Sequence, residues 1–337
     1  MNVAMVHYGD SPHPAHQGFA ESINADIISC SSENGTGLVS AGKEIVRGAQ
    51  LEYDVLIAEG SRPLIPILTQ GLFQDCKVLY LCADQFFYDV NFSTGSNAAK
   101  TCAANLVLRG IVDGIIAVSD FAGEFVRAAV GASIPMRVVH PYIQKSLFNE
   151  LENVSPDLRS MTAVTISSAP DGKVGRYKGV DLLVESWDEV RDKFPDATLR
   201  VVGERHPEVY GEKEGVQLEG YVDSIADVFR SASLYIQPSR ADTYPVAVLE
   251  ALRAGVPTIV TRTTGNRSEV RTIDPMLVSE PTPASLAEKI GYYLGSDLEY
   301  KEEVSQLARQ RGGQYSPQRW KSAFRCEFES LVREISG

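Results

Sequence analysis

Two acidic residues, Asp242 and Glu250, lie eight positions apart around what the sequence predicts to be the start of a helix. The apolar run SLYIQPS, residues 233–239, is typical of a strand, Pro245 suits the first turn of a helix, and Gly255 suits its end. A helix that begins at the carboxyl end of a strand presents free N–H groups and the positive end of its dipole. The stretch therefore predicts a phosphate site flanked by two carboxylates.

Tyr244, Pro245 and Val246 would surround such a phosphate, and the backbone N–H groups that bind it would come from Tyr244, Val246 and Ala247. Asp242 has two interpretations. It would contact the part of the ligand that lies beyond the phosphate, or it would act, as Thr243 could, only as the cap of the helix.

Glu250 shares a helix face with Val246, Leu249 and Arg253, which form a mostly apolar stripe. A carboxylate on such a face is costly unless another group donates hydrogen bonds to it. The vicinal diol of a ribose could donate two. An ion pair with Arg253 is the alternative that involves no ligand.

These residues require a parallel sheet to position them. Short apolar runs without polar alternation are buried on both faces, and their alternation with helical patterns predicts doubly wound α/β domains. In the first half the expected strands are residues 3–8, 25–30, 54–60, 77–84, 114–119 and 137–142, and the expected helices include 38–50 and 97–113. In the second half the strands are 161–169, 198–204, 216–222, 233–239 and 257–262, and the helices include 180–194, 225–232, 284–295, 299–310 and 316–335.

A chain of 337 residues suits two domains. We expect an N-terminal Rossmann-like domain over 1–145 and a polar linker over 146–160. A second Rossmann-like domain over 161–312 and a terminal segment over 313–337 follow. Ligands of such domains bind beyond the carboxyl ends of the strands.

The composition excludes several classes of function. The formal net charge of -12 and the lack of a basic run argue against nucleic-acid binding. The five cysteines show no CxxC spacing, which favours free thiols in a reducing compartment over disulfides or a zinc site. We find neither an apolar run of the roughly 18 residues that cross a bilayer nor a signal-peptide pattern, so we expect a cytoplasmic protein.

The stretch around Glu250 resembles the signature of the retaining GT-B glycosyltransferases of group 1. In that pattern a Pro-Ser precedes an acid, seven residues, a Glu and a Gly-x-Pro. The residues that match are Pro238, Ser239, Asp242, Glu250, Ala251, Gly255 and Pro257. Further matches in the family's order are Lys178 in KGVDLLVESW, Gly203 after TLRVV, Gly265 and Glu269 in TTGNRSEVR, and Ser119 in IIAVSDFA.

The resemblance implies a GT-B fold, in which two Rossmann-like domains face a cleft and the terminal helix crosses back to the first domain. It implies transfer of a hexose-type sugar from a nucleotide-sugar donor to a hydroxyl of a sugar or lipid-linked acceptor, with retention of the anomeric configuration. The product would enter glycan, glycolipid or surface polysaccharide synthesis. We expect no cofactor and no metal, and a location in the cytoplasm that includes peripheral association with the inner face of the membrane.

Carried over by position, the family implies that Glu250 holds the ribose, Lys178 neutralises the diphosphate and Asp242 contacts the transferred sugar. Backbone groups from Tyr244 to Val246 would bind phosphate. The remaining donor-side candidates are Ser239, Gly203 and Gly18, the last in a glycine-rich turn.

The sequence departs from the family at several of these positions. Asp242 replaces the usual Glu, and Thr-Tyr-Pro replaces a glycine-rich tripeptide. The expected Arg after residues 161–166 is absent, and Arg176, in the loop APDGKVGRY, is our substitute phosphate ligand. A family His is replaced at Asp84, which would contact the sugar or acceptor, or cap a turn.

The loop before residue 20 holds His13 and His16, whose spacing of three could suit a metal. Pro12 and Pro14 argue against a regular helix there, so a metal site is unsupported. His16, Gln17, Asp84 and Ser119 are our candidates for acceptor or sugar contact. Two other functions stay open: an inactive GT-B binding module, and a GT-B nucleotide-sugar epimerase.

Overall fold

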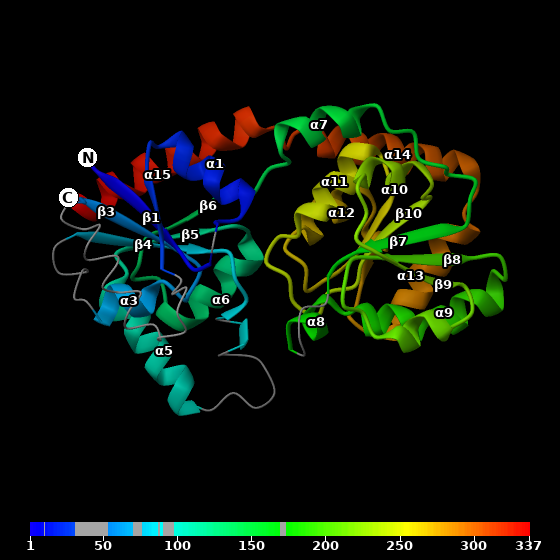
Figure 1. Cartoon of the computed structure of the whole chain (residues 1–337), viewed down its shortest axis with the longest axis horizontal. Coiled ribbons are helices and arrows are strands. Elements are labelled where there is room, and N and C mark those ends of the chain that lie inside the picture. The colour runs from blue at the N-terminus through cyan, green and yellow to red at the C-terminus, as the bar shows by residue number, and fades with distance from the viewer. Residues whose placement is uncertain (10, 31–52, 70–75, 87, 90–97, 169–172) are drawn as a thin grey trace. The chain divides into compact units, whose positions relative to one another are not determined.

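The structure, a computed structural model of the whole chain, describes residues 1–9, 11–30, 53–69, 76–86, 88–89, 98–168 and 173–337. The chain forms two compact units. Unit 1 contains Met1–Tyr142 and Pro317–Gly337, and unit 2 contains Ile143–Ser316 (Figure 1).

Unit 1 is built on a parallel sheet of six strands in the order β2-β1-β3-β4-β5-β6. Each strand falls where an apolar run predicted one, because side chains buried on both faces need no polar alternation. The strands are β1 (Val3–His7), β2 (Asp26–Ser29), β3 (Val55–Glu59), β4 (Lys77–Cys82), β5 (Gly114–Ala117) and β6 (Met136–Val138).

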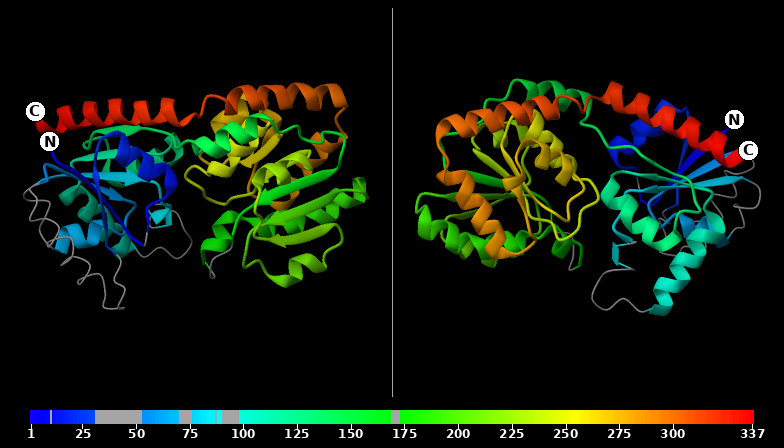
Figure 2. Two further views of the ribbon diagram at one scale, coloured as in Figure 1. Left: turned by 45° about the horizontal axis from the view of Figure 1, so that its top comes forward. Right: turned by 180° about the vertical axis from the view of Figure 1, so that it is seen from behind.

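Helices cover both faces of this sheet, with α1 and α15 on one face and α3, α5 and α6 on the other (Figures 1 and 2). The terminal helix packs on α1, where Phe324 stacks on Phe19 with ring centroids 4.4 Å apart. The helices are α1 (Pro14–Ser22), α3 (Leu64–Thr69), α5 (Ala98–Ile111), α6 (Asp120–Val130) and α15 (Pro317–Ser336). The helix expected at 38–50 lies outside the described residues.

Unit 2 contains a second parallel six-stranded sheet in the order β12-β11-β10-β7-β8-β9. Its strands again coincide with the predicted runs, and the two-residue β12 is added at one edge. They are β7 (Thr162–Ile166), β8 (Thr198–Val202), β9 (Val216–Gly220), β10 (Leu234–Gln237), β11 (Thr258–Thr261) and β12 (Val278–Ser279).

In unit 2, α9 packs against α13 and α11 packs against α14. The α-helices are α7 (Lys145–Glu152), α8 (Lys173–Lys178), α9 (Val180–Lys193), α10 (Ile225–Arg230), α11 (Val246–Ala254), α12 (Arg267–Ile273), α13 (Pro283–Gly295) and α14 (Leu298–Gly312). Two short 3₁₀ helices are η2 (Glu208–Glu212) and η3 (Pro275–Leu277).

The segment 146–160 is not an extended linker. Most of its first half is helix α7, and all of it belongs to unit 2, where α7 packs against α11. Leu151 is fully buried, and the guanidinium of Arg253 lies 4.1 Å from the ring centroid of Phe148. The sequence predicted a linker here because polar residues outnumber the apolar ones, of which Phe148 and Leu151 hold α7 in unit 2.

Candidate functional site

The candidate site of unit 2 lies where the strand order of its sheet reverses. β7 and β10 are parallel neighbours, but the chain continues from β7 to β8 on one side and from β10 to β11 on the other. Connections that leave in opposite directions open a crevice beyond the carboxyl ends of the two strands, and ligands of α/β sheets bind there. The segments that follow β7 and β10 carry Lys178 and Asp242.

Lys178 and Asp242 form an ion pair, although they are 64 positions apart in the sequence. The Lys178 ammonium donates a 2.7 Å hydrogen bond to Oδ2 of Asp242, whose side chain is 7% exposed. Gly179 makes this approach possible. Its φ is +69°, and a Cβ there would lie 2.0 Å from the carbonyl oxygen of Pro238. The glycine at position 179 is thus required by the close approach of two backbones.

Asp242 and Thr243 do not cap the next helix, contrary to one of our interpretations. Pro245 is the N-cap of α11, without a side-chain hydrogen bond. The Asp242 carboxylate is held by Lys178, and its backbone N–H donates to Thr263 while its carbonyl accepts from Gly265. The first N–H groups of α11 therefore have no capping side chain and can serve an anionic ligand.

The side chain of Tyr244 points into the unit rather than toward a ligand. It is 5% exposed, and its hydroxyl donates a 3.0 Å hydrogen bond to the hydroxyl of Tyr315. Burial is the largest of the causes that raise the pKa of Tyr244 well above its ordinary value. Glu269, which the sequence matched to a family turn, is buried and forms an ion pair with the half-buried Arg311 beside this tyrosine pair. Only the backbone of Tyr244 can take the expected role.

Glu250 lies in the second turn of α11 and is largely buried. Burial raises the pKa of its carboxyl to about 7. It does not pair with Arg253, which binds Glu152 at 3.0 Å and the carbonyl of Phe148 at 3.2 Å. Within the described residues no group donates a hydrogen bond to Glu250, so the carboxylate is available to a ligand.

Ser239 holds the end of β10 in place. It is fully buried, and its hydroxyl accepts a 2.8 Å hydrogen bond from the amide of Gln237. Its carbonyl accepts hydrogen bonds from Thr261 and Thr263. The side chain of Ser239 therefore has a structural partner and shapes the loop that carries Asp242.

Gly203 brings the ends of β7 and β8 together. Its φ is +129°, and a Cβ there would lie 2.1 Å from the carbonyl oxygen of Ser167. His206, which the sequence analysis did not single out, also binds that carbonyl, with Nε2 at 2.5 Å. Gly203 thus acts through backbone packing at the edge of the crevice.

Arg176 is exposed, and its guanidinium has no hydrogen bond within the described residues. It lies in α8 rather than in a loop, although residues 169–172 of the expected loop lie outside the described residues. Its carbonyl accepts a 2.8 Å hydrogen bond from Arg240, which also forms a two-point ion pair with Asp181. Sequence reasoning missed Arg240 and Asp181, since nothing in their spacing pairs them.

One protein family matches the segment of the chain that carries this site. Residues 171–296 match the family "Glycosyl transferases group 1", and this range contains Lys178, Asp242 and Glu250. This segment, which is less than half of the chain, is similar to the group 1 glycosyltransferases.

Known proteins match parts of this chain. An uncharacterised glycosyltransferase of Haemophilus influenzae is 31% identical over 96 residues, which are 26% of this chain and 27% of that protein. D-inositol 3-phosphate glycosyltransferase 1 of Catenulispora acidiphila is 26% identical over 225 residues, which are 58% of this chain and 52% of that protein. The matches therefore span about a quarter and about half of these relatives.

Solved structures confirm the GT-B fold of the chain. HepE of Anabaena, solved in complex with UDP and glucose, has a TM-score of 0.75 at 14% identity, covering 99% of both chains. Sucrose-phosphate synthase of Thermosynechococcus elongatus has a TM-score of 0.75 at 13% identity, again covering 99% of both.

Two of the candidates in unit 1 have structural roles. Gly18 is not in a turn but inside α1, where a Cβ would lie 1.5 Å from the hydroxyl of Tyr142 and 2.6 Å from Cε of Lys321. Ser119 is the N-cap of α6, and its hydroxyl accepts a 3.0 Å hydrogen bond from Ala122 N–H. Close packing and helix capping explain these two residues without a ligand.

Asp84 also has its oxygens occupied. Oδ2 accepts hydrogen bonds from the N–H and the hydroxyl of Ser61, at 2.7 and 2.6 Å, and Oδ1 accepts one from Tyr80 at 2.8 Å. Of our two interpretations, the structure favours the one in which Asp84 fixes a turn. The turn it fixes follows β3 and includes Gly60, whose φ is +79°.

His16 lies in a helix that we did not expect. α1 begins at Pro14, because a proline in the first turn loses no intrahelical hydrogen bond, and His13 caps it through Nδ1. His16 is 7% exposed, and its Nδ1 lies 2.5 Å from Oε1 of Glu59. Gln17 is exposed. In the described part of the chain, no three His, Cys, Asp or Glu residues could hold a metal ion.

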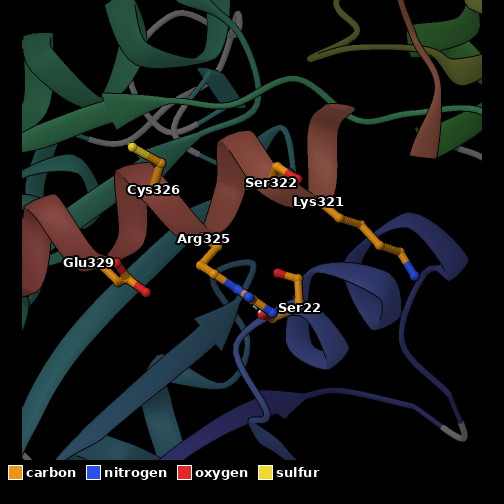
Figure 3. A pocket seen from close by; sticks show the side chains of 6 residues that line it. All are labelled: Ser22, Lys321, Ser322, Arg325, Cys326 and Glu329. Atoms are coloured by element: carbon orange, nitrogen blue, oxygen red, sulfur yellow. Dashed lines mark hydrogen bonds between the residues drawn. The ribbon is translucent and has the colours of Figure 1, made fainter. Parts of the chain in front are cut away.

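Unit 1 also has a surface cavity of about 340 Å³ between the end of α1 and the terminal helix α15 (Figure 3). Its two cationic side chains are already engaged. Arg325 donates to the carbonyl of Ser22 at 2.5 Å, and Lys321 pairs with Glu21 at 3.0 Å. The lining residues are Ser22, Lys321, Ser322, Arg325, Cys326 and Glu329.

No described helix combines the length and the hydrophobicity that a membrane span requires.

Proposed function

We propose that the protein transfers a hexose-type sugar from a nucleotide-sugar donor to an acceptor hydroxyl, with retention of the anomeric configuration. The observation that carries the proposal is the state of Glu250. It is largely buried, its pKa is raised to about 7 by burial, and no described group donates a hydrogen bond to it. The diol of a ribose would supply the missing hydrogen-bond donors. Glu250 lies in the second turn of α11, the helix whose first N–H groups have no capping side chain.

The donor would be bound by the segments that follow β7 and β10. Its ribose would bind Glu250, and its diphosphate would lie at the start of α11, where the N–H groups have no capping side chain. Lys178 would neutralise the diphosphate. An ammonium group has three donors, so Lys178 can keep its hydrogen bond to Asp242 and still bind phosphate oxygens. Arg176, exposed on α8, is the second candidate cation.

In the transfer step the bond between the anomeric carbon and the diphosphate oxygen breaks on the face where the acceptor oxygen bonds. The acceptor proton passes to the departing diphosphate. The work of the protein is to position the reactants and to stabilise charge on the leaving group. Asp242 contributes by holding Lys178 in place.

The structures of HepE with UDP and with UDP-glucose make a uridine diphosphate sugar the first donor to test. The acceptor would be a sugar or a lipid-linked carrier in glycan, glycolipid or surface polysaccharide synthesis. The protein would act in the cytoplasm or at the inner face of the membrane, without a metal.

The test is a transfer assay with UDP-glucose and a set of sugar acceptors, followed by proton NMR of the product. An α-linked product formed from the α-linked donor, at an unchanged rate in EDTA, is the expected result. A β-linked product would contradict retention, and loss of activity in EDTA would contradict a metal-free reaction. Nucleotide binding without turnover would indicate an inactive module. Free UDP with an altered hexose would indicate an epimerase.

A further inference from the structure

Unit 1 has a strand-order reversal of its own, and one pair of side chains lies beside it. In the order β2-β1-β3-β4-β5-β6, the chain continues from β1 to β2 on one side and from β3 to β4 on the other. Ligands of doubly wound sheets bind beyond the carboxyl ends of the two strands at such a point. β1 ends at His7 and β3 ends at Glu59, and α1 begins in the segment that follows β1.

Glu59 and His16 meet at this point. Oε1 of Glu59 accepts a hydrogen bond from Nδ1 of His16, at 2.5 Å, and another from the N–H of His13, at 3.2 Å. Both side chains of the pair are largely buried, at 9% exposed for His16 and 11% for Glu59. Phe19 lies beside the imidazole, with ring centroids 6.2 Å apart.

This geometry fixes the imidazole in one orientation and one tautomer. Burial alone would raise the pKa of Glu59, but the hydrogen bonds from the His16 ring and from the N–H of His13 help to outweigh it, and the pKa is lowered. An ionised Glu59 keeps the proton of His16 on Nδ1. In the neutral ring Nε2 then carries a lone pair, and Nε2 has no hydrogen bond to any described residue.

We propose that His16 and Glu59 form an acceptor-binding dyad, in which Nε2 of His16 accepts a hydrogen bond from a hydroxyl of a polyol acceptor and Glu59 orients the ring. The assignment rests on the proposed glycosyl transfer. It extends that function, because it places the acceptor at the reversal point of unit 1 and names the atom that binds it.

A rigid support holds the dyad in position. Asp84 fixes the turn after β3 through its two hydrogen bonds from Ser61, and Tyr80 fixes Asp84 in turn. Gly60 lies in this turn directly after Glu59, with Oδ2 of Asp84 only 3.0 Å from where a Cβ would stand. On the other side, the cap of His13 holds the first turn of α1. A side chain held in this way can orient a substrate group without first being ordered.

The test compares His16→Gln and Glu59→Gln with wild type in transfer from UDP-glucose, with D-glucose, fructose 6-phosphate and myo-inositol as acceptor probes. Both variants should lower kcat/KM for the acceptor by about tenfold, the usual effect of losing one substrate hydrogen bond. Hydrolysis of UDP-glucose without acceptor should change little. Glu21→Gln is the matched control. It removes another carboxylate near α1, which pairs with Lys321, and should leave both reactions unchanged.

Three outcomes would overturn the assignment. The first is an unchanged acceptor kcat/KM in both variants. The second is an equal loss of transfer and of donor hydrolysis, which would place the effect outside acceptor binding. The third comes from nitrogen-15 NMR of the histidine rings in the wild-type chain, which needs no substrate. His16 protonated on Nε2 near neutral pH would contradict the predicted tautomer.

The NMR measurement also separates the dyad from the proposed function. If wild type binds no nucleotide sugar and transfers nothing, the proposed function fails. The dyad is then judged by whether any of the three acceptor probes shifts the Nε2 resonance of His16, and no shift with any of them overturns it. A shift that Glu59→Gln abolishes supports it.

Discussion

The carboxyl group of Glu250 links the stability of the protein to its ligand. Burial raises its pKa from 4.5 to about 7, so in the empty site the proton is retained up to neutral pH. A bound ribose would donate hydrogen bonds to the ionised form and stabilise it. The same carboxylate is therefore unfavourable for folding and favourable for binding, which is common for residues kept for function.

We expect Glu250→Gln to make the folded protein more stable above neutral pH. The pKa of Glu250 is higher in the folded than in the unfolded chain, so its contribution to stability is lost as pH rises from about 4.5 to about 7. At about 1.36 kcal/mol per pKa unit, the ionised Glu250 carboxylate lowers the free energy of unfolding by a penalty of about 3 kcal/mol above neutral pH. The variant lacks it. Thermal melts should show the variant more stable than wild type near pH 8 and similar near pH 4.5, and an equal difference at both pH values would refute the assignment.

Asp242 leads to a different prediction, because it binds Lys178 and not the ribose. Asp242→Asn removes one negative charge from the phosphate site but frees the ammonium to move. We expect UDP to bind at least as tightly and the transfer rate to fall by about tenfold or more, because charge stabilisation depends on a fixed donor. Calorimetry and initial rates measure the two effects. Weaker UDP binding at an unchanged rate would contradict this role.

The helices and strands place these side chains through a few close backbone approaches. The Lys178–Asp242 pair exists because Gly179 lets the start of α9 touch Pro238, and the edge of the crevice exists because Gly203 lets β8 touch Ser167. Neither approach can be inferred from hydrophobic periodicity. The family resemblance pointed to the glycines, but the contact that requires each of them is visible only in the fold.

Gly179→Ala tests this dependence. Alanine would face a positive φ, which costs about 1 kcal/mol, and a contact of 2.0 Å with the carbonyl of Pro238. Gly220→Ala is the control in the same unit, since its φ is +63° and nothing lies within 4 Å. Urea unfolding should show a larger loss for Gly179→Ala than for Gly220→Ala, with loss of UDP binding only in the former. Equal losses of stability in the two variants would contradict a role for the contact between Gly179 and Pro238.

Most of the secondary structure was predictable from the sequence, because buried parallel strands are continuous apolar runs. The misses have identifiable causes. α1 was rejected on account of Pro12 and Pro14, yet a proline at the first helical position is tolerated. α7 was hidden by its polar composition. The ion pair of Lys178 with Asp242 and the dyad of His16 with Glu59 join residues 64 and 43 positions apart, which spacing alone cannot pair.

The molecule as a whole consists of two units, and each has a strand-order reversal with a candidate binding site. Unit 2 carries the proposed donor site at β7 and β10, and unit 1 the proposed acceptor dyad at β1 and β3. The terminal helix α15 belongs to unit 1, although unit 2 separates it from the rest of that unit in the sequence. The core of unit 1 therefore closes only when the end of the chain has folded.

Phe324→Ala tests whether the two units unfold separately. Phe324 is fully buried against Phe19, and truncating a buried aromatic ring typically costs about 3–5 kcal/mol. Calorimetry should show a lower transition temperature for unit 1, while the transition that UDP-glucose stabilises, that of unit 2, stays in place. Cys326→Ala, at an exposed position of the same helix, should change neither. A uniform downward shift of one single transition would show that the units do not unfold separately.

Titration calorimetry with UDP-glucose on wild type and Glu250→Gln measures whether Glu250 binds the ribose of a nucleotide sugar. We expect the wild-type affinity to fall as pH drops below about 7, because the carboxyl must lose its proton to accept hydrogen bonds from the diol. The variant should bind at least about tenfold more weakly at pH 8, without that pH dependence. Equal affinity of both proteins at every pH would contradict the claim.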